Sequence, residues 1–153
     1  MKITRRDLVV AIIAVGATLG VVALAQADKP IMGSSAFDGN SIEATPTKIG
    51  ATRKFFQAPT ATLDELECHV TTLNPGETPH PPHKHPDEEV IIVKEGTVES
   101  LVNGETRRLG PGSVIFQASN QIHGIRNVGK VPAVYHVIKW NSPGMLKAKR
   151  PAE

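Results

Sequence analysis

Residues 76–96, GETPHPPHKHPDEEVIIVKEG, decide what this chain can fold into and what it can bind. The stretch holds three of the chain's six histidines, and an apolar run follows them. On an extended strand, side chains two residues apart point to the same face. One strand can therefore present His83, His85 and Glu89 on one side, since they lie at offsets of two and four. Two imidazoles and a carboxylate on one face form a metal site that lacks a ligand.

Short strands separated by turns fill the chain from Ala61 onward. Asn103-Gly104, between two such runs, is the strongest hairpin signal. No stretch has a convincing helical period, apart from a short turn near 145–149. Short strands at near-regular spacing favour an all-β sandwich or small barrel. The strands that the pattern predicts are 52–56, 66–72, 89–94, 97–102, 105–109, 113–116, 122–127 and 133–140.

A fourth candidate ligand, His123, lies 34 residues after Glu89 in one of these predicted strands. With His123 included, two segments of the chain resemble the two motifs of the cupin family, and the resemblance covers roughly residues 63–140. The matching positions are His83, His85, Glu89 and Gly96 in the first motif, and Gly112, His123 and Asn127 in the second.

A few positions depart from the family's pattern, and none of them is a ligand position. Six residues rather than the usual five separate Gly76 from His83. Ala118 and Asn120 replace a proline and a glycine of the second motif, in the loop before His123.

The resemblance implies a jelly-roll β-barrel over residues 61–141 with one divalent metal inside. By the same resemblance the ligands are His83, His85, Glu89 and His123. Three imidazoles and one carboxylate suit Mn, Fe, Co, Ni or Zn. Four protein ligands leave one or two positions open on a five- or six-coordinate ion, which is what a catalytic metal requires.

The function expected from this site is a metal-dependent reaction on a small-molecule substrate. Among the chemistries of similar single-domain cupins, a dioxygenase-type oxidoreductase is favoured. Glu89 would remain a ligand or loosen to act as a base, and no other catalytic residue is assigned. The alternatives are a non-catalytic module that binds a metal or small ligand, and a barrel with an empty site.

The remaining histidines are assigned weaker roles. His80 follows a proline in a loop and is expected to be solvated, at the mouth of the pocket. His69 shares its parity with Glu65 and Glu67 and is expected to be a surface residue or a cross-strand partner rather than part of the site. His136 alternates with apolar residues and is expected to point into the core, and Phe116 is expected to line the barrel.

Residues 1–27 have the features of an export signal. A basic start precedes an apolar run, 8–24, and small residues before position 28 offer cleavage sites. Residues 4–9, TRRDLV, resemble a twin-arginine signal. An ordinary secretory signal is one alternative. An uncleaved membrane anchor is another, since the length of the apolar run is near the lower limit for a helix that spans a bilayer. Each alternative places the rest of the chain outside a bacterial cytoplasm, in the periplasm or otherwise exported.

Composition limits the partners. Outside residues 1–27 there are 14 basic and 14 acidic residues, so the body has no basic face that would suit nucleic acid. The single cysteine, Cys68, excludes an intrachain disulfide and a cysteine-rich zinc site. Residues 28–60 are expected to be a linker or N-terminal arm, and 142–153 a C-terminal tail. The resemblance implies a homodimer that pairs through a strand from residues 28–56.

Overall fold

The computed structural model describes residues 30–143. The expected export signal, the helical turn near 145–149 and most of the expected tail lie outside these residues. Within the described range, no helix has the length and hydrophobicity needed to cross a bilayer.

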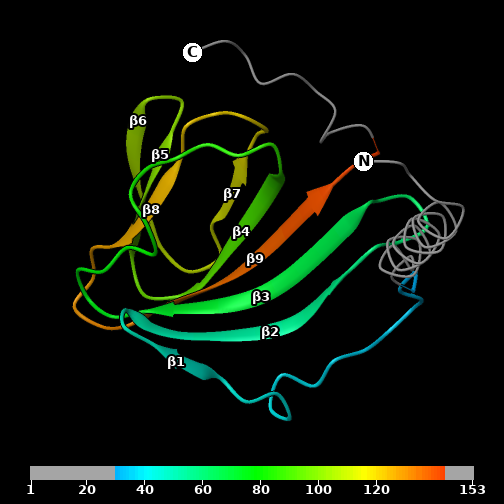
Figure 1. Cartoon of the computed structure of the whole chain (residues 1–153). Coiled ribbons are helices and arrows are strands. Elements are labelled where there is room, and N and C mark those ends of the chain that lie inside the picture. The colour runs from blue at the N-terminus through cyan, green and yellow to red at the C-terminus, as the bar shows by residue number, and fades with distance from the viewer. Residues whose placement is uncertain (1–29, 144–153) are drawn as a thin grey trace, which may run out of the picture. The chain divides into compact units, whose positions relative to one another are not determined.

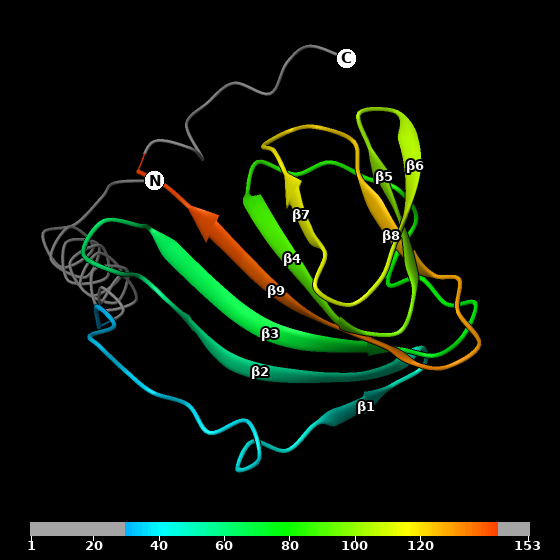
Figure 2. The same cartoon turned by 180° about the vertical axis from the view of Figure 1, so that it is seen from behind.

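The described residues form two antiparallel sheets that face each other (Figure 1). The larger sheet has six strands in the order β1-β2-β3-β9-β4-β7, and the smaller has the order β6-β5-β8. Figure 2 shows the same two layers from behind. This arrangement confirms the predicted all-β jelly-roll barrel. The strands are β1 (Thr45–Thr47), β2 (Gly50–Ala58), β3 (Glu65–Leu73), β4 (Glu88–Glu95), β5 (Val98–Val102), β6 (Glu105–Leu109), β7 (Val114–Gln117), β8 (Gly124–Asn127) and β9 (Ala133–Asn141).

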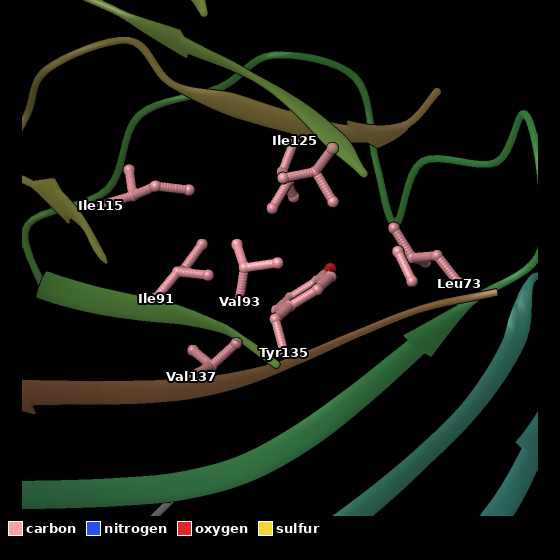
Figure 3. Packing of buried hydrophobic residues seen from close by; sticks show 9 residues of the cluster. Leu73, Ile91, Val93, Ile115, Ile125, Tyr135 and Val137 are labelled. Carbon is pink, nitrogen blue, oxygen red and sulfur yellow. The ribbon is translucent and has the colours of Figure 1, made fainter. Parts of the chain in front are cut away.

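The hydrophobic core lies between the two sheets, as Figure 3 shows. Ile91, Val93 and Val137 project from the larger sheet toward Ile125 of the smaller one. Tyr135 lies among them with 2% of its surface exposed. Because strands alternate their side chains, each strand supplies only every second residue to this interior.

Two turns follow from the residues that form them. Asn103 and Gly104 both have positive φ, 53° and 79°, as a tight two-residue hairpin requires. Gly96 has a φ of 79°, and a Cβ there would lie 2.6 Å from the Cα of Ala133. Only glycine fits at this position, because it accepts the positive φ and the close approach of the chain.

The N-terminal part of the larger sheet lies within the stretch expected to be an arm. β2 is longer than the predicted strand 52–56, and it pairs with most of the length of β3. β1 forms the edge of the sheet beside β2.

Three side-chain directions were predicted wrongly. On β3, the buried residues are Glu67 and Leu73, so His69 belongs to the interior face and not to the surface. His136 lies on the outer face, where its ring stacks on Phe55 at 6.4 Å. Phe116 is 52% exposed and does not line the barrel. In each case the outer face of the larger sheet carries apolar residues of its own, so hydrophobic alternation alone does not tell inside from outside.

One buried amide connects the ends of three segments. The side chain of Asn127 is fully buried, and its Nδ2 donates to the carbonyl oxygens of Leu73 at 2.8 Å and Val131 at 2.9 Å. Its Oδ1 accepts a 2.8 Å hydrogen bond from the backbone N–H of Gly129. The end of β8 is thereby fixed to the end of β3 and to the loop before β9.

We predict that Asn127→Ala lowers the free energy of unfolding by about 2–4 kcal/mol, because one buried and two partly buried hydrogen bonds to backbone groups are lost. Urea denaturation followed by circular dichroism measures this. The matched control is Asn74→Ala at an exposed position, which should change the free energy of unfolding by less than about 0.5 kcal/mol. Equal stability of the two variants would contradict the assigned role of Asn127.

Candidate metal centre

A backbone bridge between two loops brings the two halves of the site together. His83 and His123 form an antiparallel bridge in which each donates its N–H to the other's carbonyl oxygen, at 3.0 and 2.9 Å. Residues in such a directly paired position carry their side chains on the same face. The loop before β4 and the loop before β8 therefore present their imidazoles to one point.

His85 joins these two residues, so the structure brings together three of the four residues that the sequence singled out as candidate ligands. One ring nitrogen from each of His83, His85 and His123 lies within 4.8 Å of the other two. The ring centroids are 4.7 Å apart for His83–His123 and for His85–His123. These separations suit three donors around one ion.

Hydrogen bonds to backbone carbonyl groups fix the orientation of two of the three imidazole rings. Nδ1 of His85 lies 3.1 Å from the carbonyl oxygen of Asp87, and Nδ1 of His123 lies 2.9 Å from that of Gln121. A carbonyl only accepts, so each Nδ1 carries the proton and each Nε2 keeps its lone pair. Metal-binding histidines are usually fixed in this way.

Two ring nitrogens are buried without a hydrogen-bond partner in the described part of the chain. They are Nδ1 of His83 and Nε2 of His123. Burial and the neighbouring imidazoles lower the pKa of His83 to about 4, and burial lowers the pKa of His123. At neutral pH these imidazoles are uncharged, so their nitrogen lone pairs can bind a metal. A cation would supply the partner that those lone pairs lack. The residues present therefore fit a divalent metal.

Glu89 lies beside the histidine cluster. Its Oε2 is 3.9 Å from Nε2 of His85. Burial raises the pKa of Glu89 to about 7, against the smaller opposing effect of Lys139. A bound cation would favour the charged carboxylate and so reverse this effect.

The cluster opens into a cavity of about 220 Å³. At about 30 Å³ per water molecule, this is room for a small molecule and little more. Besides the four candidate ligands, polar side chains of His69, Gln117, Tyr135 and Lys139 line it.

Sequence reasoning missed most of these lining residues. Lys139 is paired directly with Glu67 on one side and Glu89 on the other, so all three point into the barrel at one level. Gln117 pairs with Glu89 from the far side. The signal that identifies them is the strand register, because any residue opposite Glu89 must share its face, and only the folded sheet supplies that register.

His80 and Glu88 lie at the margins. His80 is exposed and also lines the cavity, and its ring centroid is 3.9 Å from that of His83. Glu88 accepts a 3.1 Å hydrogen bond from the indole N–H of Trp140. Trp140 itself stacks on the outward-facing Phe116, so Glu88 serves the outer face.

Known proteins resemble this chain in sequence over part of its length. Residues 69–139 match the model of the Cupin_2 family, a cupin domain. Over 64 residues the chain is 38% identical to dimethylsulfoniopropionate lyase DddQ of Ruegeria pomeroyi. These 64 residues are 41% of this chain. The match covers only 31% of the length of that relative.

Solved structures share the fold at low sequence identity. The Cnp3 cupin domain of Schizosaccharomyces pombe has a TM-score of 0.60 and 15% identity, over 73% of this chain and 72% of that one. The polyketide cyclase RemF of Streptomyces resistomycificus has a TM-score of 0.58 and 22% identity, over 72% and 82%. KdgF from Halomonas sp. has a TM-score of 0.57 and 19% identity, over 74% and 99%. The matched residues run from within β3 to within β9 and include all three clustered histidines, so the resemblance to cupin domains covers the candidate metal centre.

Proposed function

We propose that the cupin domain binds one divalent metal through His83, His85, Glu89 and His123 and uses it in a reaction on a small molecule. The observation that carries the proposal is the convergence of three histidines from two loops on one cavity, with two of their nitrogens buried and unpartnered. Mn, Fe, Co, Ni and Zn all accept this donor set. When bound, such an ion polarises an oxygen of the substrate or activates water or dioxygen.

The chain's own residues would do the rest. The carbonyl oxygens of Asp87 and Gln121 hold two imidazoles in the tautomer that leaves Nε2 free. The small cavity restricts the size of the molecule that reaches them. Lys139, which lines the cavity, places a positive charge 3.4 Å from Glu67 and 3.8 Å from Asp87.

We predict close to one metal ion per chain in the native protein, and its loss in both His83→Ala and His123→Ala, because each removes a ligand from a different half of the site. Elemental analysis of the purified proteins measures this. His136→Ala is the matched control, since its ring lies on the outer face. Metal retained in both ligand variants, or absent from the native protein, would contradict the proposal.

The reaction class has two candidates. A dioxygenase is the one that the sequence favoured by resemblance. A non-oxidative lyase is favoured by the 38% identity over 64 residues to a protein named as a lyase. A non-catalytic binding module is the alternative to both.

We expect a screen of small phenolic, keto-acid and sulfonio-acid compounds to separate these candidates. Oxygen uptake that requires the metal would support the dioxygenase. Products formed at the same rate without oxygen, followed by proton NMR, would support the lyase. Binding without turnover, seen by calorimetry with the metal-loaded protein, would support the binding module, and the His83→Ala variant should fail in every assay.

We also propose export to the periplasm, on the strength of residues 1–27 in the sequence. In a Gram-negative host, the full chain should appear in the periplasmic fraction, and Arg5→Lys with Arg6→Lys should keep it in the cytoplasm if a twin-arginine signal directs it. Undiminished export of the double variant would favour an ordinary secretory signal. Recovery of the native chain with the membrane fraction would favour an uncleaved anchor. A homodimer remains a prediction, for which the sheet edge at β1 is the candidate surface.

A further inference from the structure

A carboxylate and an imidazole lie side by side on the cavity-facing side of β3. Oε1 of Glu67 is 3.0 Å from Nδ1 of His69. These residues are two apart on one strand, so both point into the barrel. Neither residue belongs to the histidine cluster.

The carboxylate of this pair is held in place from both sides. Glu67 is 8% exposed. One of its oxygens contacts His69, and the other, Oε2, lies 3.4 Å from the ammonium of Lys139 on β9. Because each oxygen has its own partner, the carboxylate cannot rotate without breaking a contact. Lys139 thereby places a positive charge beside this carboxylate.

An ionised carboxylate only accepts hydrogen bonds, so Nδ1 of His69 donates to it. The neutral ring then carries its lone pair on Nε2, the nitrogen on the opposite side. No hydrogen bond to Nε2 is found among residues 30–143, and the ring lines the cavity. Burial lowers the pKa of His69, which keeps the imidazole in its basic, neutral form at neutral pH.

His69 lines the same cavity as the cluster of His83, His85 and His123. His69 pairs with Val137 of β9, which pairs with Ile91 of β4, two residues along from Glu89. With strands spaced by about 4.8 Å, β3 and β4 lie about 10 Å apart across β9. A small molecule that spans this cavity can therefore contact both the histidine cluster and His69.

We propose that His69, oriented by Glu67, is the general base of this site, an inference that rests on the proposed metal-dependent function. The substrate class is a small carbonyl or carboxylate compound that carries a C–H bond next to the oxygen-bearing carbon. The lone pair of Nε2 takes the proton, and the electron pair of the C–H bond stays on the substrate as an enolate. The imidazolium is stabilised by Glu67 and later returns the proton to the substrate, so no oxidant or reductant is needed.

The first test asks whether Nε2 is a free base, and it needs no substrate. Diethyl pyrocarbonate should modify His69 in the native protein, as located by peptide mass spectrometry, and the rate should follow the fraction of neutral imidazole. The charged groups near the ring are Glu67, Lys139 and Lys54 of β2. Since Glu67 raises the pKa of His69, Glu67→Gln should move the midpoint of this reaction to lower pH.

The second test measures proton removal itself. Metal-loaded protein is incubated in D₂O with pyruvate, 2-oxobutanoate, malate or dimethylsulfoniopropionate, and deuterium at the carbon next to the oxygen-bearing carbon is followed by NMR. We expect exchange above the buffer rate for at least one compound. His69→Gln should reduce it about 100-fold or more, and Glu67→Gln by a smaller factor. His136→Gln, on the outer face, should exchange at the native rate.

Metal content and thermal unfolding of each variant separate this inference from the proposed function. Exchange at the native rate in a folded, metal-loaded His69→Gln protein would overturn the inference, as would a metal-loaded native protein that exchanges none of the four compounds. A His69 that resists modification, or a midpoint that Glu67→Gln does not move, would also overturn it. Native protein without metal would instead overturn the proposed function.

Discussion

The paired backbone of His83 and His123 is the contact on which the rest of the site depends. The two residues are far apart in sequence, and one precedes β4 while the other precedes β8. Their two mutual hydrogen bonds join the loop before β4 to the loop before β8. Every other donor at the site is placed relative to this bridge. His85 follows His83 by two residues, and Glu89 follows on the strand that the loop leads into.

The interior of the barrel changes character along its strands. One cross-strand row is polar, with Glu67, Lys139, Glu89 and Gln117 side by side on β3, β9, β4 and β7. Two residues further along each strand, the row contains His69, Val137, Ile91 and Ile115, and the hydrophobic core begins with the last three. Buried charges are costly unless they are paired. Lys139 meets that requirement by contacting carboxylates on both sides, so the polar row can lie directly on the core.

The fold was predictable because turns and short strands are determined by residues close together in the sequence. Asn103-Gly104 specifies a hairpin wherever it lies, and the spacing of His83, His85 and Glu89 reflects a single strand. The three clustered histidines were predictable for the same reason, once two motifs were matched. The inner position of His69 and the outer positions of His136 and Phe116 were not. On β3 the cavity makes the inner face polar, while apolar contacts cover the outer face, so the usual rule of alternation inverts. Strand register carries that information, and register is a property of the folded sheet.

The histidine bridge also has a consequence for how an ion would be chosen. Main-chain hydrogen bonds hold His83 and His123 in register, and carbonyl groups orient His85 and His123. The loops that carry the ligands would need little further ordering when an ion binds. Little of the free energy of ion binding would then offset the cost of ordering the chain. A rigid donor set cannot contract or expand much to follow ionic radius. Selection among similar cations would then depend on how well each ion fits a spacing set by β-sheet geometry, and only weakly on the flexibility of the surrounding loops.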